Sequence, residues 1–381
     1  MKIIGYLIFT FFYHTFWLFC RVKPKKVFAI MTHDESLDGN VGQVVDFLKE
    51  KEEGYRFHYL TKKDRQISGN IQGLKGIISF FVMKPYHLAR SEVILMDNVF
   101  LPMAYMKMRK SVKVIQLWHG TGTIKKFGQD VNTGSLKKLE KRANHRITHL
   151  IVNSEETKRI YSRAFGIPLD KVYVLGLPRT DIFFSEEMIK ERREQFFAQF
   201  PNLKNKRLLL YAPTFRDEES KQPKIALDTK LIGEELKDYA LLLRLHPFVE
   251  EAYRREGESA NRIDGSNIIS MTGYPDINTL LLVSDYLITD YSSIIFDYCL
   301  QGKPMIFYAY DLEEFSNQGR GFYHPYEHLV PGPVVKNTEE IIELIKKDQF
   351  DLDRIEDFKR KQYRYLDGKS TERLYLHILK K

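Results

Sequence analysis

Short apolar runs that alternate with helical stretches are the feature that most restricts how this 381-residue chain can fold. Such alternation is typical of parallel α/β layers. It predicts a first series of strands at 26–31, 56–60, 92–97, 112–118 and 149–154. A second series is predicted at 207–213, 239–247, 267–272, 285–290 and 304–310. Helices are predicted between them at 41–51, 155–165, 229–238, 277–283 and 292–301, and after them at 338–347.

Two such series predict two doubly wound, Rossmann-like domains that face a cleft. The chain becomes charged and then polar at 186–206, so we place the boundary there and expect domains at 27–195 and 196–381. The charged, helical stretch from Asp351 onward is expected to pack across both domains. Open parallel sheets bind ligands beyond the carboxyl ends of their strands, so the cleft is the expected site.

Residues 1–26 form a separate predicted segment, an amphipathic membrane helix followed by a basic cluster. No formally charged side chain occurs from Ile3 to Cys20, and four basic residues follow closely. On a helix, one stripe carries polar and aromatic residues, namely Tyr6, Thr10, Tyr13, His14, Trp17 and Arg21. The opposite face carries Ile4, Ile8, Phe11, Phe12 and Phe19. This pattern favours a helix that lies in the membrane interface over one that spans it, and packing on the protein's own surface is the alternative.

A net charge of +9 favours an anionic partner such as a nucleotide, another phosphate or an anionic lipid. No helix-turn-helix, zinc-finger or RNP pattern accompanies the charge, so nucleic acid is not expected as a partner. The two cysteines, Cys20 and Cys299, lack the spacing of metal ligands and fit a reducing compartment. The chain also lacks a Walker loop, a G-x-G-x-x-G after a strand and an H-E-x-x-H motif. We therefore predict no metal site and no cofactor.

The first candidate site follows the predicted strand at 112–118. His119 comes directly after that strand, and small and basic residues follow it, namely Gly120, Thr121, Gly122, Lys125 and Lys126. Glycines let a ligand approach the backbone closely, and N–H groups and lysines favour oxyanions. A histidine in this position can take a proton from a hydroxyl near neutral pH. A histidine satisfied within a turn is the alternative.

Three further clusters follow strands of the second series. Arg244 and His246 end one strand, and Pro247 favours an extended backbone that presents His246 at the strand tip. Thr214 and Arg216 follow another strand, and arginine suits a pyrophosphate. The last cluster precedes a helix whose first turn would favour an anion, and consists of Thr289, Asp290, Ser292 and Ser293. The alternatives are a turn histidine, a surface arginine and an Asp or Ser that caps its own helix.

Five motifs, in order along the chain, resemble the CDP-glycerol glycerophosphotransferases of wall teichoic acid synthesis. They are "WHGT" at 118–121 with Lys125 and Lys126, "RTD" at 179–181, "YAPTFR" at 211–216, "RLHP" at 244–247, and "TDYSS" at 289–293 with Asp297. The resemblance extends from about Glu92 to roughly Lys347. One departure is that the family often has proline and leucine after "WHGT", where this chain has Gly122, Thr123 and Ile124.

The resemblance implies a GT-B architecture and an enzyme that uses CDP-glycerol and releases CMP. It implies a peripheral protein at the cytoplasmic face of the cell membrane that acts on an undecaprenyl-linked disaccharide. The length and the aromatic N-terminal helix are most like the primase that adds the first glycerol phosphate. The alternatives are a poly(glycerol phosphate) or ribitol phosphate transferase, a GT-B sugar-nucleotide glycosyltransferase, and a non-catalytic protein that binds anionic lipid. Other teichoic acid enzymes are candidate partners.

The resemblance also implies roles for single residues. His119 is predicted to be the general base, and His246 to bind the β-phosphate or assist CMP departure, with an exchange of the two roles left open. The predicted substrate-binding residues are Gly120, Thr121, Lys125, Arg179, Thr214, Arg216, Arg244, Thr289, Asp290, Ser292, Ser293 and Asp297. From the residues alone, Arg179 and Asp181 are expected to pair across the domain joint. Positioning and charge stabilisation should carry most of the catalysis, as in other phosphoryl transfers.

Overall fold

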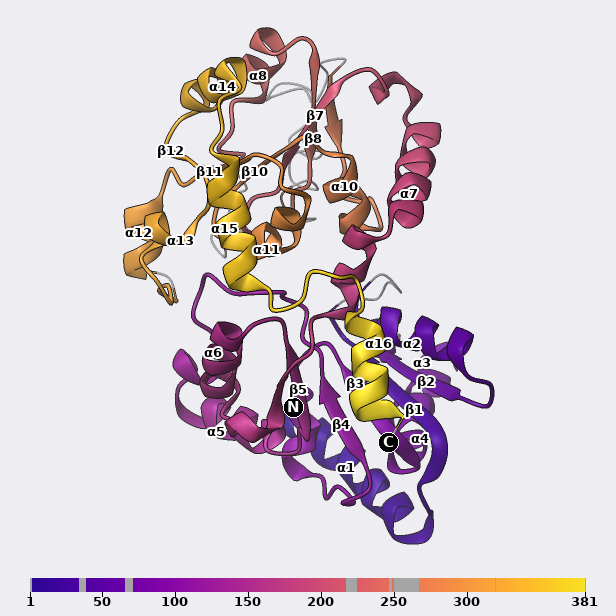
Figure 1. Cartoon of the computed structure of the whole chain (residues 1–381). Helices are drawn as coiled ribbons and strands as arrows, with labels where there is room; N and C mark the ends of the chain where they lie inside the picture. The colour runs from indigo at the N-terminus through magenta and orange to yellow at the C-terminus, as the bar shows by residue number, and fades with distance from the viewer. Residues whose placement is uncertain are drawn as a thin grey trace. The chain divides into compact units, whose positions relative to one another are not determined.

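The computed structural model describes residues 2–33, 39–65, 71–216, 225–246, 249, 267–318 and 320–380. These residues form two compact units, each built on a six-stranded parallel sheet (Figure 1). Unit 1 comprises Met1–Thr121, Lys126–Asp181 and Tyr363–Lys381, and unit 2 comprises Gly122–Lys125 and Ile182–Gln362. The two parallel α/β sheets confirm the predicted fold class, whereas the cleft between the domains stays a prediction.

The sheet of unit 1 has the strand order β2-β1-β3-β4-β5-β6. Its strands are β1 (Lys23–Met31), β2 (Arg56–Thr61), β3 (Ser91–Met96), β4 (Lys113–Gln116), β5 (His149–Val152) and β6 (Val172–Val174). The first five agree with the predicted strands. Strand β6 is additional, because a run of three residues is too short to be distinguished by its pattern.

The alternation of side chains along the strands divides the core of unit 1 into two layers. Phe28 and Ile30 of β1 lie in one layer, and Val27 and Ala29 lie in the other. The first layer is completed by α1 (Lys2–Phe19), α4 (Lys84–Ala89), α5 (Gly134–Asn144) and α6 (Glu155–Phe165). The second is completed by α2 (Asn40–Lys51), α16 (Ser370–Leu374) and the turn Tyr375–Leu379. The short helix α3 (Ile71–Ile78) and a π-helical turn, Ser79–Met83, precede α4.

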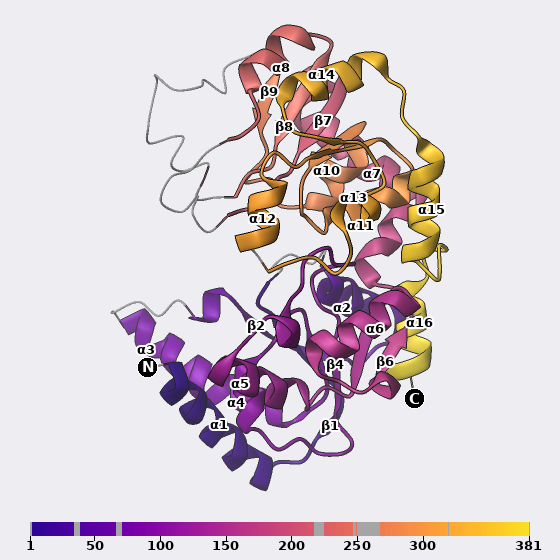
Figure 2. The ribbon, with the colours of Figure 1, turned by 90° about the vertical axis from the view of Figure 1, so that its left-hand side faces the viewer.

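Helix α1 packs through its polar and aromatic stripe and exposes its apolar face. Thr10 and Tyr13 are buried, and the Tyr13 hydroxyl donates to the Lys107 carbonyl at 2.9 Å. The exposed side chains, which are 42% to 83% accessible, are Ile3, Ile4, Leu7, Ile8, Phe11, Leu18 and Phe19. Figure 2 shows α1 on the outside of unit 1, where it packs against α4. No helix in the described part of the chain has the length and hydropathy needed to cross a membrane.

The sheet of unit 2 has the strand order β12-β11-β10-β7-β8-β9. Its strands are β7 (Arg207–Tyr211), β8 (Tyr239–Leu243), β9 (Ile268–Ser270), β10 (Tyr286–Thr289), β11 (Met305–Tyr308) and β12 (Val334–Val335). Its helices include α7 (Glu186–Gln199), α8 (Thr229–Glu235), α10 (Ile277–Val283), α11 (Ile294–Tyr298), α12 (Leu312–Gln318), α13 (Tyr326–Leu329), α14 (Thr338–Lys347) and α15 (Leu352–Gln362). The five predicted strands are present, and the two-residue β12 is additional.

The units divide the chain differently from the predicted domains. The predicted boundary lies between residues 195 and 196, whereas the main segment of unit 2 begins at Ile182 and contains all of α7. The charges of α7 do not mark a linker, because this helix packs on α10, where Arg193 donates to the Leu282 carbonyl at 2.8 Å. The C-terminal stretch contributes α15 to unit 2 and then, from Tyr363, returns to unit 1 with α16.

Each sheet reverses its strand order at one place. The reversal lies between β1 and β3 in unit 1 and between β7 and β10 in unit 2. In open α/β sheets the chain connections leave such a point toward opposite faces, and ligands bind in the resulting crevice at the carboxyl ends of the strands. The residues that follow these four strands are therefore the first candidates for a functional site.

Candidate active site

Three polar residues follow adjacent strands at the reversal point of unit 1. Asp97 follows β3, and its carboxylate accepts hydrogen bonds from the backbone N–H groups of Thr32 at 2.9 Å and His33 at 3.0 Å, both after β1. The Asp97 carbonyl lies 2.9 Å from Nδ1 of His119, which follows β4. The His33 and His119 rings stack with their centroids 3.6 Å apart and their planes 5° apart. Asp97 thus connects the ends of three strands.

The contact with Asp97 determines the tautomer of His119. A carbonyl oxygen can only accept a hydrogen bond, so Nδ1 carries the hydrogen. In the neutral ring the lone pair then lies on Nε2. A histidine in this form can take a proton at Nε2, which is what a general base does.

The backbone around His119 has an unusual conformation that its neighbours hold in place. Trp118 has a φ of 57°, in the left-handed region that bulky residues rarely adopt. Its N–H donates to Gln116 Oε1 at 2.9 Å, and its carbonyl accepts from Asn40 Nδ2 at 3.1 Å. Arg179 Nη1 donates to the His119 carbonyl at 3.0 Å. These contacts stabilise the strained turn that carries His119.

The other residues predicted for unit 1 have structural partners. Arg179 supports the backbone of His119, and its own N–H is accepted by Asn40 Oδ1 at 3.0 Å. Gly120 and Thr121 are buried, and the Gly120 carbonyl accepts from the Tyr161 hydroxyl at 3.0 Å. Asp181, the expected partner of Arg179, accepts hydrogen bonds at 2.9 and 2.8 Å from two backbone N–H groups at the start of α16. The "RTD" motif therefore braces the His119 turn and the C-terminal helix of the same unit.

The loop that follows Thr121 belongs to unit 2. A Cβ atom on Gly122 would lie 2.5 Å from the buried Phe296 ring, so the packing requires glycine there. Lys125 enters unit 2 with this loop and forms no ion pair with any residue the structure describes. Burial lowers the pKa of Lys125 to about 8, since the negative charge of Asp290 opposes only part of the burial cost. The positive charge of Lys125 is thus only partly offset by neighbouring negative charge.

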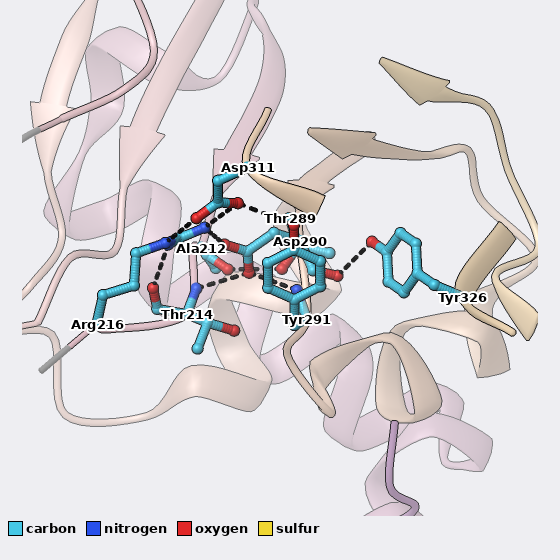
Figure 3. A network of polar contacts seen from close by, with 8 residues as sticks. All are labelled: Ala212, Thr214, Arg216, Thr289, Asp290, Tyr291, Asp311 and Tyr326. Atoms are coloured by element: carbon cyan, nitrogen blue, oxygen red, sulfur yellow. Dashed lines mark hydrogen bonds and ion pairs between the residues drawn. The ribbon is translucent and has the colours of Figure 1, made fainter. Parts of the chain in front are cut away.

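A polar network occupies the reversal point of unit 2 (Figure 3). Asp290, after β10, accepts from the backbone N–H groups of Thr214 at 2.7 Å and Tyr291 at 2.6 Å. Arg216, after β7, pairs with Asp290 at 3.0 Å and with Asp311 at 2.6 Å. Asp311 follows β11 and also accepts from the Tyr291 hydroxyl at 2.8 Å. One guanidinium therefore lies between two carboxylates.

Two predicted substrate-binding residues of unit 2 make structural contacts, and their part in substrate binding stays a prediction. Thr289 is fully buried, and its hydroxyl donates to the Ala212 carbonyl at 2.6 Å. Arg244 Nη1 donates to the carbonyls of Met271 at 2.6 Å and Tyr274 at 2.7 Å. These contacts hold the segments that follow β7 and β9.

The predicted anion site directly precedes a helix that begins two residues later than predicted. Helix α11 begins at Ile294, after the two serines, and continues directly into a 3₁₀ turn, Cys299–Gln301. Ser292 Oγ accepts from the Ile294 N–H at 3.4 Å, while Ser293 directly precedes the helix and Asp297 is buried within it. This cluster shapes the end of β10, and its part in substrate binding stays a prediction.

A small hollow in unit 2 brings together Thr214, Arg216 and His246. The His246 ring stacks on Phe215 with a centroid distance of 4.0 Å. Burial lowers the pKa of His246, so its ring is neutral near pH 7. The buried Thr214 hydroxyl has no hydrogen-bond partner among the residues that the structure describes, which leaves it available to a ligand. Pro247, predicted to orient His246, lies outside the described residues.

Three residues of these two clusters are absent from the predicted set, namely His33, Asp97 and Asp311. Each stands at or just after the end of a predicted strand, the same signal that singled out His119. Within the described ranges, no three His, Cys, Asp or Glu side chains come together in a group that could hold a metal ion.

The family model "CDP-Glycerol:Poly(glycerophosphate) glycerophosphotransferase" matches residues 11–380 of the chain. The chain belongs to this family. The match extends over both units and confirms the resemblance seen in the five motifs.

Two curated relatives of this glycerophosphotransferase-family chain come from Bacillus spizizenii. The chain is 35% identical to a teichoic acid poly(ribitol-phosphate) polymerase, over 98% of the chain and 59% of that relative. It is 33% identical to a teichoic acid ribitol-phosphate primase, over 93% of the chain and 90% of that relative. The chain thus spans less than two thirds of the polymerase and most of the primase.

The fold of the glycerophosphotransferase-family chain is similar to that of the wall teichoic acid polymerase TagF. A TagF variant soaked with CDPG superposes with a TM-score of 0.78 and 22% identity, over 94% of this chain and 89% of that one. Identity at this level shows a shared fold.

Proposed function

We propose that the chain transfers glycerol phosphate from CDP-glycerol to a sugar hydroxyl of an undecaprenyl-diphosphate-linked disaccharide. The hydroxyl oxygen attacks the β-phosphorus, the bond from that phosphorus to the bridging oxygen breaks, and CMP leaves with the electron pair. The observation that carries the proposal is the tautomer of His119, whose Nε2 lone pair can receive the hydroxyl proton. We further propose that one unit is added, as by a primase.

The groups at the reversal point of unit 2 are the proposed donor-binding groups. Arg216 already shares its charge with two carboxylates, so we assign it to orienting the pyrophosphate and not to neutralising it. Lys125 is the better candidate for neutralising phosphate charge, because it lacks an ion-pair partner among the described residues. The neutral His246 ring and the Thr214 hydroxyl can hydrogen-bond the donor from the hollow.

We expect donor binding to take up protons slightly above pH 8. With a pKa of about 8 in the free protein, Lys125 is mostly neutral at about pH 8.5. A phosphate beside the amine favours its charged form, so its pKa rises and Lys125 gains a proton. Calorimetric titrations with CDP-glycerol in two buffers of different ionisation enthalpy measure this uptake. Lys125→Met should abolish it, and Lys126→Met, which changes the adjacent lysine, should not. Equal uptake by wild type and Lys125→Met would remove Lys125 from the proposed site.

Ribitol phosphate transfer is the second candidate, because both relatives described above are named for ribitol phosphate. Binding of CDP-glycerol, CDP-ribitol and a UDP-sugar to the wild-type chain distinguishes the donor classes. Tightest binding of CDP-glycerol would support the first proposal, and tightest binding of CDP-ribitol would replace it by the second. Binding of the UDP-sugar alone would contradict both and favour a glycosyltransferase.

We propose that the chain works as a peripheral protein at the cytoplasmic face of the membrane, with the exposed face of α1 in the interface. Seven large apolar side chains on that face are accessible, and Arg21 and Lys23 follow its end. An apolar face beside basic residues suits a bilayer with anionic headgroups. A lipid-linked acceptor would meet the protein at this surface, where other teichoic acid enzymes are proposed partners.

Two substitutions on α1 are expected to weaken membrane binding strongly. Phe11 and Phe19 are 66% and 83% exposed, so their change to serine should leave the fold intact. Each phenylalanine buried in a membrane contributes roughly 1.5–3 kcal/mol, so the double variant should bind vesicles about 100-fold or more weakly. Sedimentation with vesicles that contain anionic lipid measures the change. A matched double variant, Leu169→Ser with Leu352→Ser, alters residues that are 49% and 48% exposed elsewhere. Equal losses in both variants would contradict the proposal.

A further inference from the structure

We propose that His33 is a positioning residue for His119, an inference that rests on His119 being the base. The His33 ring lies flat on the His119 ring, with centroids 3.6 Å apart and planes 5° apart. The Trp118 ring contacts the same imidazole at 4.0 Å with a tilt of 32°. Two rings at these distances cannot share one face of an imidazole, so His119 is held from both faces.

Asp97 couples the two histidines through two different groups. Its carboxylate accepts from the His33 N–H at 3.0 Å, and its carbonyl accepts from His119 Nδ1 at 2.9 Å. Asp97 is only 2% exposed, so this anchor is part of the core, whereas His33 itself is exposed. His33 and Asp97 follow β1 and β3, the two strands that flank the reversal point. The stack therefore stands where a parallel α/β sheet binds its ligand.

The stack has a consequence for the proton transfer itself. Rotation of the His119 ring would break the hydrogen bond to Asp97 and move Nε2, and His33 blocks that rotation on one face. His33 and Trp118 thus restrain the ring that receives the proton. This restraint acts on the chemical step and leaves the donor-binding groups of unit 2 unchanged. His33 should therefore affect kcat and not the KM for CDP-glycerol.

The test compares two substitutions of His33 in the full chain. His33→Ala should lower kcat about 10- to 100-fold, as expected when a reacting group loses its orientation, with the KM for CDP-glycerol within about 3-fold of wild type. His33→Phe keeps an aromatic ring in the stack and should restore most of kcat. His58→Ala is the matched control, because His58 stacks on His87 at the same 3.6 Å but lies inside β2 and not after it. It should leave kcat unchanged.

A double variant separates this inference from the proposed function. If His33 acts through His119, then His33→Ala should cause no further loss in a His119→Ala background. An additional loss there, wild-type kcat in His33→Ala, or no rescue by phenylalanine would each overturn the positioning role while the base assignment stands. If His119→Ala itself leaves turnover unchanged, the base assignment falls and the role of His33 falls with it. Unfolding midpoints close to wild type for each variant confirm that the fold is retained.

Discussion

Replacement of His119 by alanine is expected to lower kcat by roughly 10²- to 10⁴-fold, the usual loss when a general base is removed. The KM for CDP-glycerol should change little, because the proposed donor-binding groups lie in unit 2 and are untouched. The physical reason is the tautomer set by the Asp97 carbonyl, which places the reactive lone pair on Nε2. Initial rates of CMP release over a range of CDP-glycerol concentrations give both constants.

Two further histidine variants make this prediction specific. His377→Ala removes an exposed histidine of the same unit and should have no effect. His246→Ala should raise the KM for CDP-glycerol, because its neutral ring is proposed to hydrogen-bond the donor. Turnover within a few-fold of wild type in His119→Ala, together with a large fall in kcat in His246→Ala, would show that the two histidines exchange roles.

Replacement of Arg216 by methionine is expected to lower the free energy of unfolding by about 3–5 kcal/mol, the usual cost of removing one partner from a buried ion pair. Arg216 pairs with Asp290 and Asp311, whose side chains are only 2% and 14% exposed. Without the guanidinium, two neighbouring carboxylates stay buried and repel each other. Urea unfolding of the wild-type and variant chains measures the difference.

A surface ion pair provides the control for this prediction. Arg163 pairs with Asp130 at 3.0 Å, but its side chain is 62% exposed. Exposed pairs contribute about 0–1 kcal/mol, so Arg163→Met should change stability by no more than that. Adding Asp311→Asn to Arg216→Met should recover part of the loss, because it removes one of the two charges. Equal losses in Arg163→Met and Arg216→Met, or no recovery in the double variant, would contradict the role given to the network.

The predicted strands are present because they are continuous apolar runs, and such runs identify buried parallel strands from local sequence alone. The order of the strands depends on pairing between distant segments, such as β7 with β10, and local sequence does not contain it. Strands β6 and β12 are too short to produce a recognisable run. The charged helix α7 looks like a linker in sequence because its packing partner, α10, lies more than 70 residues further along the chain.

For the candidate site, the position of a residue after a strand predicts that it lies near the site but does not predict its role. His119 follows a strand next to the reversal point of unit 1, and Arg216 and Asp290 follow the two strands at the reversal point of unit 2. Whether a polar group faces a ligand or a carbonyl depends on the loops around it. Arg244 binds backbone carbonyls that come from the loop after β9, and no feature near "RLHP" indicates this. The contact between His33 and His119 is made only by the fold, so the sequence does not indicate it.

The most direct test of the proposed reaction is CMP release from CDP-glycerol by the wild-type chain, with a lipid-linked disaccharide acceptor and the products analysed by mass. We predict CMP release that depends on the acceptor, and a product heavier by one glycerol phosphate. A ladder of additions would keep the reaction and replace priming by polymerisation. No release of CMP from CDP-glycerol, with a UDP-sugar consumed by the same preparation, would contradict the proposed glycerol phosphate transfer.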